Sequence, residues 1–259
     1  MNHHYQYTDQ LVQKSLKYEL LANYYKYIDP ARHIHYYQKH FQCVQRLMTM
    51  GYRADMQQLM NMMESTPRMA NIRVLHASPN APAVDVYANG QQILKNVSYK
   101  QVSDYLSVPS GEYVIDIVPT GKPAQRVLRQ RVMIQPGATI TVAAAGTVEN
   151  LQLIPVTDKT SSSPGKASVR FFHLSPDAPA VDIAVEDGPV LFRNVSFGNA
   201  ANYIEIDPAQ VNLEVRLAGT DTVVLTIPNV NIQPNKAYTA VAVGLAEGTP
   251  SLEAIFLMP

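Results

Sequence analysis

Two stretches of the sequence repeat one another and decide the fold that we expect. Residues 74–86 read VLHASPNAPAVDV, and residues 171–183 read FFHLSPDAPAVDI. The repeat continues along the chain, since Asn-Val-Ser at 96–98 returns at 194–196 and Tyr105 corresponds to Tyr203. Because a long internal repeat is the signature of a duplicated structural unit, the sequence predicts two copies of one domain.

Apolar and polar residues alternate with a period of two within each copy. Tyr113, Ile115 and Ile117 share one face of a run in the first copy, and Val223, Leu225 and Ile227 do so in the second. Turn-forming residues separate such runs, and no helical pattern lies between them. Seven or eight short strands of this kind predict an immunoglobulin-like β-sandwich. The expected fold class is mainly β, with two tandem sandwiches behind an α-helical segment.

Four segments follow from these patterns. We expect a helical segment at 1–68, a first sandwich at 69–157, a linker at 158–166 and a second sandwich at 167–259. The linker is predicted from composition, because the run is polar, rich in Ser and interrupted by Pro164 and Gly165. Each copy has enough apolar residues for a core of its own, so the sandwiches are expected to be beads and not units of a solenoid, and the sequence leaves open whether they pack together.

The first segment is rich in Tyr, Met and His, and its apolar residues recur at helical spacing. Asp29 and Pro30 form a helix start, with Asp as the cap and Pro in the first turn. The apolar stripe that follows consists of Ile34, Tyr37, Phe41, Val44 and Met48. A third short helix is predicted at 55–64. We interpret the stripe either as the core of a helical hairpin or as a surface for self-assembly or partner docking.

Composition and charge narrow the function classes. The formal net charge is zero, so charge offers no argument for nucleic-acid binding. Cys43 is the only cysteine, which excludes a disulfide within the chain. The N-terminus lacks the apolar core of a secretory signal, and no stretch approaches the roughly 20 apolar residues that cross a bilayer. We therefore expect synthesis in the cytoplasm without a signal peptide, and no membrane span.

The repeated Ser-Pro-x-Ala-Pro-x-Val-Asp motif is the candidate site. Its prolines restrict the backbone, so the segment after the first strand should be stiff. Two interpretations stay open: the side chains tie a rigid crossover to the backbone, or they bind a cation or another ligand. Spacing alone makes no catalytic pair of the His and the Ser, and we assign no catalytic residue, cofactor or metal ligand. The candidate residues are His76, Ser78, Asp85, His173, Ser175 and Asp182.

The doubled motif resembles the signature of a bacterial family known as domain of unknown function 4397. The resemblance covers about residues 71–259 and implies tandem β-sandwiches without an established activity, usually on secreted or cell-surface proteins. This chain differs in its Tyr/Met/His-rich helical segment, whose composition resembles that of bacterial spore-coat proteins. Such proteins are made in the mother-cell cytoplasm and need no signal peptide.

These observations favour a non-catalytic structural or assembly protein of a bacterial spore coat or surface layer. The expected partners are further copies of the chain or other coat or surface proteins, and no nucleic acid. The alternative is a binding module that holds a carbohydrate, a peptide or a metal ion at the Ser-Pro-x-Ala-Pro motif.

Overall fold

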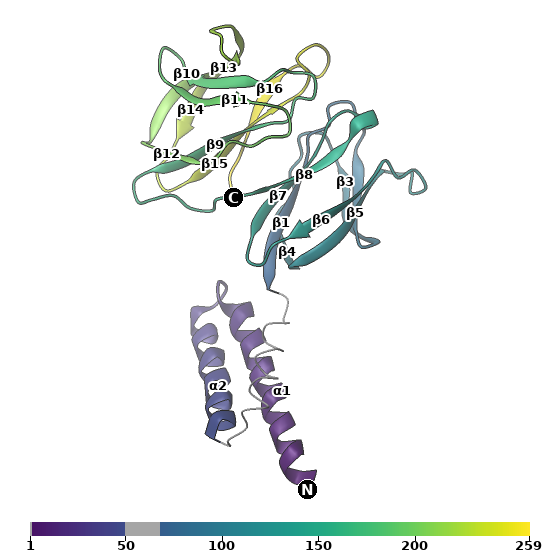
Figure 1. Ribbon diagram of the computed structural model, residues 1–259, viewed down its shortest axis with the longest axis vertical. Helices are drawn as coiled ribbons and strands as arrows, with labels where there is room; N and C mark the ends of the chain where they lie inside the picture. The colour runs from purple at the N-terminus through teal and green to yellow at the C-terminus, as the bar shows by residue number, and fades with distance from the viewer. Residues whose placement is uncertain (1, 50–67) are drawn as a thin grey trace. The chain divides into compact units, whose positions relative to one another are not determined.

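The computed structural model describes residues 2–49 and 68–259, with the side chains of 2–6 left aside (Figure 1). The chain divides into two compact units, residues 1–67 and residues 68–259. The first unit contains a helical hairpin, and the second contains all the described strands. The third helix predicted at 55–64 lies outside the described residues.

The hairpin consists of α1 (Asn2–Tyr25) and α2 (Pro30–Thr49). The predicted start of α2 is confirmed, because the backbone N–H of Arg32 donates to Oδ1 of Asp29 at 3.0 Å. Apolar contact between the two helices centres on Leu11 and Leu47. The rest of the helix–helix contact includes polar and aromatic groups. For example, Nδ1 of His33 lies 2.8 Å from the carbonyl oxygen of Ala22 in α1.

The second unit is built from two β-sandwiches of the same topology, which confirms the predicted fold class. In the first, one sheet has the order β4-β1-β7-β8 and the other the order β3-β2-β5-β6. Their bounds are β1 (Met69–His76), β2 (Val84–Ala88), β3 (Gln91–Val97), β4 (Leu106–Pro109), β5 (Gly111–Pro119), β6 (Leu128–Ile134), β7 (Thr139–Ala145) and β8 (Gln152–Thr157). A short 3-10 helix, η1 (Val148–Asn150), connects β7 to β8.

The second sandwich repeats this arrangement with the sheet orders β12-β9-β15-β16 and β11-β10-β13-β14. Its strands are β9 (Ala167–His173), β10 (Val181–Val185), β11 (Val190–Val195), β12 (Ile204–Ile206), β13 (Ala209–Leu217), β14 (Val223–Ile232), β15 (Ala237–Val243) and β16 (Glu253–Leu257). In both copies the strand that ends in the motif histidine pairs in parallel with a later strand, β1 with β7 and β9 with β15. All other strand pairs within the sheets are antiparallel among the described residues.

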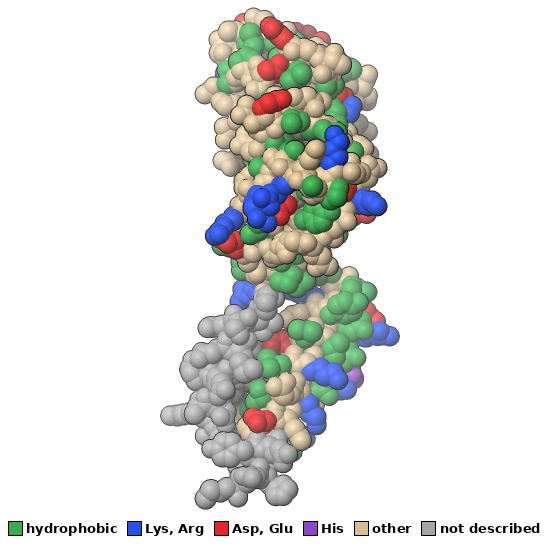
Figure 2. Space-filling view, turned by 90° about the vertical axis from the view of Figure 1, so that its right-hand side faces the viewer, with side chains coloured by type: hydrophobic (Ala, Val, Ile, Leu, Met, Phe, Trp, Pro, Cys, Tyr) green, Lys and Arg blue, Asp and Glu red, His purple; other side chains and the backbone are tan. Residues whose placement is uncertain are grey.

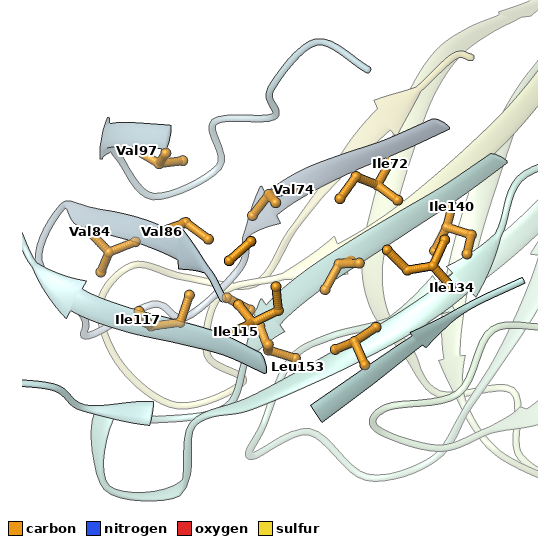
Figure 3. Packing of buried hydrophobic residues seen from close by; sticks show 14 of the residues in the cluster. Ile72, Val74, Val84, Val86, Val97, Ile115, Ile117, Ile134, Ile140 and Leu153 are labelled. Atoms are coloured by element: carbon orange, nitrogen blue, oxygen red, sulfur yellow. The ribbon is translucent and has the colours of Figure 1, made fainter. Parts of the chain in front are cut away.

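Inward-facing residues of the two sheets form the core of each sandwich. In the first copy, Val86, Ile115 and Ile117 come from one sheet and face Ile140 and Leu153 from the other (Figure 3). The alternation seen in the sequence therefore marks the side of each strand that turns towards its own core.

A third apolar cluster joins the two sandwiches to each other. Its central residues are fully buried and lie on the outer faces of the sheets, away from the core of their own sandwich: Leu75 and Ala143 in the first copy, Phe172 and Val241 in the second. These four occupy equivalent places, because Leu75 pairs with Ala143 as Phe172 pairs with Val241. The two sandwiches, whose packing the sequence left open, therefore lie against each other, since each buries one outer sheet face against the other.

The expected linker at 158–166 is not free of the fold. Asp158 is buried and forms ion pairs with Arg73 and Arg170, one from each sandwich. Further along, Lys166 pairs with Asp207 at 2.7 Å. Composition predicted flexibility because the run offers nothing apolar to bury, but its polar side chains are held by specific partners instead.

Candidate functional site

The motif histidines are buried and bonded to the backbone of their own motif. Nε2 of His76 lies 3.1 Å from the carbonyl oxygen of Pro82, and Nε2 of His173 lies 3.0 Å from that of Pro179. Each contact spans six residues, so the ring braces the proline-containing loop against the strand that carries it. Burial lowers the pKa of both imidazoles, while the contacts with the proline carbonyls oppose that shift.

The motif serines do not form a nucleophile–base pair with these histidines. Oγ of Ser78 is buried and has no hydrogen-bond partner among the described residues, and Oγ of Ser175 donates to Asp177 at 3.2 Å. In both copies Nε2 of the histidine is directed to a proline carbonyl. The observed geometry holds a loop in place and presents no activated hydroxyl.

Asp85 and Asp182 hold a bulge between two strands. Oδ1 of Asp85 accepts from the backbone N–H of Asn96 at 2.8 Å, and Oδ1 of Asp182 accepts from that of Asn194 at 2.7 Å. Both asparagines have positive φ, 55° and 51°, and the strand register shifts nearby. The repeated Asn-Val-Ser is thus a backbone feature that the motif aspartate stabilises.

The second oxygen of Asp182 accepts from the backbone N–H of Gly219, and Arg193 lies at 3.9 Å. These contacts lower the pKa of the Asp182 carboxyl, with the Asn194 N–H as the largest cause. In the first copy, the corresponding extra donor is the hydroxyl of Thr120, which donates to Oδ1 of Asp85 at 2.8 Å.

Asn80 and Asp177, which the site prediction omitted, complete the motif. Oδ1 of Asn80 accepts from the backbone N–H of Val148 at 2.9 Å. The two carboxylate oxygens of Asp177 accept from the N–H groups of Ala246 and Glu247. The variable position after Ser-Pro therefore fastens the loop that follows β7 or β15. The recurrence of an Asn or Asp at this place was the signal that pointed to it.

A charged cluster that sequence reasoning missed lies between the two sandwiches. Asp158 is its centre: Tyr105 donates to Oδ2 at 2.6 Å, as does Thr141 at 2.5 Å, and Arg170 donates to Oδ1 at 2.6 Å. Burial, followed by the contact with Asp158, raises the pKa of the Tyr105 hydroxyl. Buried charges need such partners, so the cluster is a structural joint.

The joint is built from equivalent residues of the two copies. Arg73 donates to Thr141 and its guanidinium lies 4.6 Å from the centre of the Tyr105 ring. Arg170 does the same with Thr239 and Tyr203.

The arginines also exchange backbone contacts. Arg73 donates to the carbonyl of Met258 in the second sandwich at 2.6 Å, and Arg170 donates to that of Thr157 in the first at 2.7 Å. Thr157 and Met258 are equivalent positions, because each directly follows the residue that pairs with Thr141 or with Thr239. This reciprocity is the mark of an interface with approximate two-fold symmetry.

Most side chains of the predicted stripe on α2 are exposed to solvent within the helical unit. Ile34, Tyr37, Phe41 and Met48 are between 52% and 58% exposed. Val44 differs, because it packs with Leu11 and Leu47 inside the hairpin.

The described residues offer neither a metal site nor a membrane-spanning helix. Residues 2–49 and 68–259 contain no group of three or more His, Cys, Asp or Glu side chains placed to hold a metal ion. Neither helix of these ranges is long and apolar enough to cross a bilayer.

The chain is similar to a few solved structures at low sequence identity. Comparison with curated proteins gives no match. Among solved structures, the chain is similar to the C-terminal domain of AlgF from P. aeruginosa, with 21% identity, a TM-score of 0.29 and coverage of 37% of this chain and 99% of that one. It is also similar to the Bacillus anthracis TIE protein, with 13% identity, a TM-score of 0.23 and coverage of 69% of this chain and 34% of that one.

A family model covers the first sandwich and the beginning of the second. Residues 70–184 match the family described as Domain of unknown function (DUF4397). The match includes both copies of the motif and ends within β10. The predicted resemblance to the DUF4397 family is therefore confirmed over residues 70–184.

Proposed function

We propose that this chain is a non-catalytic structural protein of a bacterial surface layer, such as a spore coat. In this proposal the paired sandwiches form one rigid body, and the helical hairpin docks that body onto another copy of the chain or another coat protein. The exposed stripe on α2 carries the proposal.

The stripe is the feature that a docking role explains. Four large side chains of one helix face, Ile34, Tyr37, Phe41 and Met48, are each more than half exposed. In the space-filling view, hydrophobic side chains (green) are spread over the visible face of the hairpin (Figure 2). Contiguous exposed apolar surface is a common feature of protein–protein interaction sites, because its burial is favourable by about 25 cal/mol per Å².

The motif supports a structural role over a catalytic one. The imidazoles of His76 and His173 and the carboxylates of Asp85 and Asp182 are engaged with backbone groups of the same sandwich. Groups engaged in this way contribute rigidity, and a coat protein benefits from rigid units.

The proposal is tested by the assembly state of the full chain in sedimentation velocity. We expect an oligomer, and we expect Phe41→Asp to convert it into a monomer, because the new carboxylate would be buried in the interface. Gln42→Asp is the matched control: it adds the same charge at an exposed position of the same helix that lies outside the stripe, and it should leave the oligomer intact. A full-length chain that is monomeric at micromolar concentrations contradicts docking onto another copy of the chain.

Ligand binding is a second candidate function. The expected place was the Ser-Pro-x-Ala-Pro motif, but a cavity of about 360 Å³ lies elsewhere, inside the second sandwich. That volume is at the lower end of the range for small-molecule sites.

A further inference from the structure

The first sandwich closes the gap between its two edge strands, β6 and β8, with one side chain. Nε2 of Gln130 donates to the carbonyl of Leu153 at 2.9 Å, and Oε1 accepts from the N–H of Leu153 at 2.9 Å. The Leu153 side chain is buried and points into the core beside Ile115 (Figure 3). A glutamine clamp and a leucine filler therefore seal this edge.

The second sandwich has neither group at the equivalent places. Leu213 pairs with Ile227 as Ile115 pairs with Gln130, so an isoleucine takes the position of the clamp. Ala242 pairs with Ala254 as Ala144 pairs with Leu153, so an alanine takes the position of the filler. The isoleucine side chain has no group that could form a hydrogen bond with the facing backbone. The alanine side chain has three carbon atoms fewer than that of leucine.

An extra residue in β14 alters the same edge further. Arg131 alone separates Gln130 from Val132, whereas Pro228 and Asn229 both separate Ile227 from Val230. The register of the β13–β14 pair shifts at this point, and Asn229 has a φ of 56°. Its N–H donates to Oδ1 of Asn212 at 2.8 Å, which holds the bulge in place.

A cavity of about 360 Å³ lies between the two sheets of the second sandwich, and the clamp position Ile227 and the bulge residues Pro228 and Asn229 line it. Its lining is mainly apolar and includes Phe171, Leu213, Ile227, Val230, Tyr238 and Ala240. Phe171 and Tyr238 are larger than their counterparts Val74 and Ile140, yet they do not fill the space. Phe256 and Met258, 40% and 52% exposed, also line the cavity, so it reaches the surface beside β16.

The lining defines the chemistry of an occupant. Arg170 is the charged residue of the lining, and its guanidinium is already held by Asp158, Thr157 and Thr239. Two exposed polar members of the lining from β14, Asn229 and Asn231, carry uncharged amides. Apolar cavities of this kind stay dry and take up apolar molecules.

We propose that this cavity binds the aliphatic tail of an uncharged amphiphile, with the polar head at Asn229 and Asn231. The observation that carries the proposal is the internal comparison: the same fold, in the same chain, seals this space in one copy and leaves it open in the other.

The test is the binding of N-phenyl-1-naphthylamine, an uncharged fluorescent probe, to the full-length protein. Ala254→Leu places the larger side chain of the first sandwich at the equivalent position of β16, and Ala240→Val adds volume within the lining from the neighbouring strand of the same sheet, as Val142 does in the first copy. We expect each variant to weaken probe binding about tenfold or more. Neither should lower the melting temperature, because filling a cavity adds contacts.

Two further measurements separate this site from other apolar surfaces. Phe41→Asp changes the α2 stripe and not the cavity, so it should leave the affinity for the probe unchanged. The binding proposal can therefore hold even if the assembly proposal fails. 1-Decanol should displace the probe, and decanoate should compete much less well because its charge finds no free partner. Unchanged binding in both filled variants, loss of binding in Phe41→Asp, or equal competition by decanoate overturns the proposal.

Discussion

The guanidinium of Arg170 lies 2.6 Å from Oδ1 of Asp158, and the two side chains are only 4% and 1% exposed. Arg170 belongs to β9 of the second sandwich, whereas Asp158 follows β8 of the first. Oδ2 of the same carboxylate lies 3.5 Å from Arg73 in β1. One carboxylate therefore connects two buried arginines from two sandwiches, and several properties of the protein should depend on it.

Replacement of Asp158 should destabilise the whole strand-rich unit. Asp158→Ala leaves Arg73 and Arg170 buried without their carboxylate, and breaking a buried pair costs about 3–5 kcal/mol. Chemical denaturation followed by circular dichroism measures the loss. Asp207→Ala is the control, because its carboxylate is 80% exposed and pairs only with a partly exposed lysine, and it should cost roughly 1 kcal/mol or less. Equal effects of the two substitutions would show that Asp158 is not a joint.

Limited proteolysis should cut between Asp158 and Lys166 but should not separate the sandwiches. The run is polar and several of its residues are exposed, which favours cleavage there. The two fragments should nevertheless coelute in native size exclusion, because Leu75 and Phe172 would otherwise be exposed to water. Denaturing electrophoresis identifies the cut, and fragments that elute separately would show that this apolar cluster does not hold the two sandwiches together.

Removal of the motif aspartates should lower stability without a metal effect. Asp85→Ala or Asp182→Ala leaves the N–H of Asn96 or Asn194 without its acceptor, which costs about 1–3 kcal/mol. Asp221→Ala, at a fully exposed position, is the control for loss of charge. Thermal melts with and without calcium or zinc are the measurement. A metal-dependent rise in melting temperature that these variants abolish would favour the binding alternative at the motif.

The motif histidines should make the protein less stable as the pH falls. Burial lowers their pKa in the folded state, so the unfolded chain binds more protons below the ordinary value of about 6.5. The stability that they contribute is therefore present above pH about 6.5 and is lost as the pH falls from there towards their folded pKa.

The denaturation midpoint should accordingly fall between pH about 7 and about 5. In the double variant His76→Gln and His173→Gln, which keeps a side-chain donor for the proline carbonyls, this decrease should be smaller. A pH dependence identical to that of the parent protein would show that these two histidines do not cause the effect.

Much of the fold followed from local sequence patterns. The period of two in 112–117 and 223–227 identified strands, because alternate residues of a strand face the same side. The duplicated motif located equivalent strands in the two copies, and Asp29-Pro30 located the start of α2, because caps and first turns depend on neighbouring residues. The sequence singled out Asp85 and Asp182 but left their partners open.

Tertiary structure decided which part of the protein covers the outer face of the sheets that contain β7 and β15. The runs 140–146 and 237–243 lack the polar alternation of strands with one face in water, which is typical of strands buried on both faces. That pattern does not say what the second covering layer is, and here it is the other copy of the domain.

Asp158 shows why composition misjudged the linker. A polar run usually remains in solvent, and only the folded chain brings Arg73 and Arg170, distant in sequence, to the same carboxylate. The cavity has the same origin: Ile227 and Ala240 line it and are ordinary strand residues, which only strand pairing and sheet packing bring to one space. Local periodicity therefore determined which residues form the strands and helices. The joint and the cavity arose from contacts between distant segments, whose energies depend on geometry that no short stretch of sequence contains.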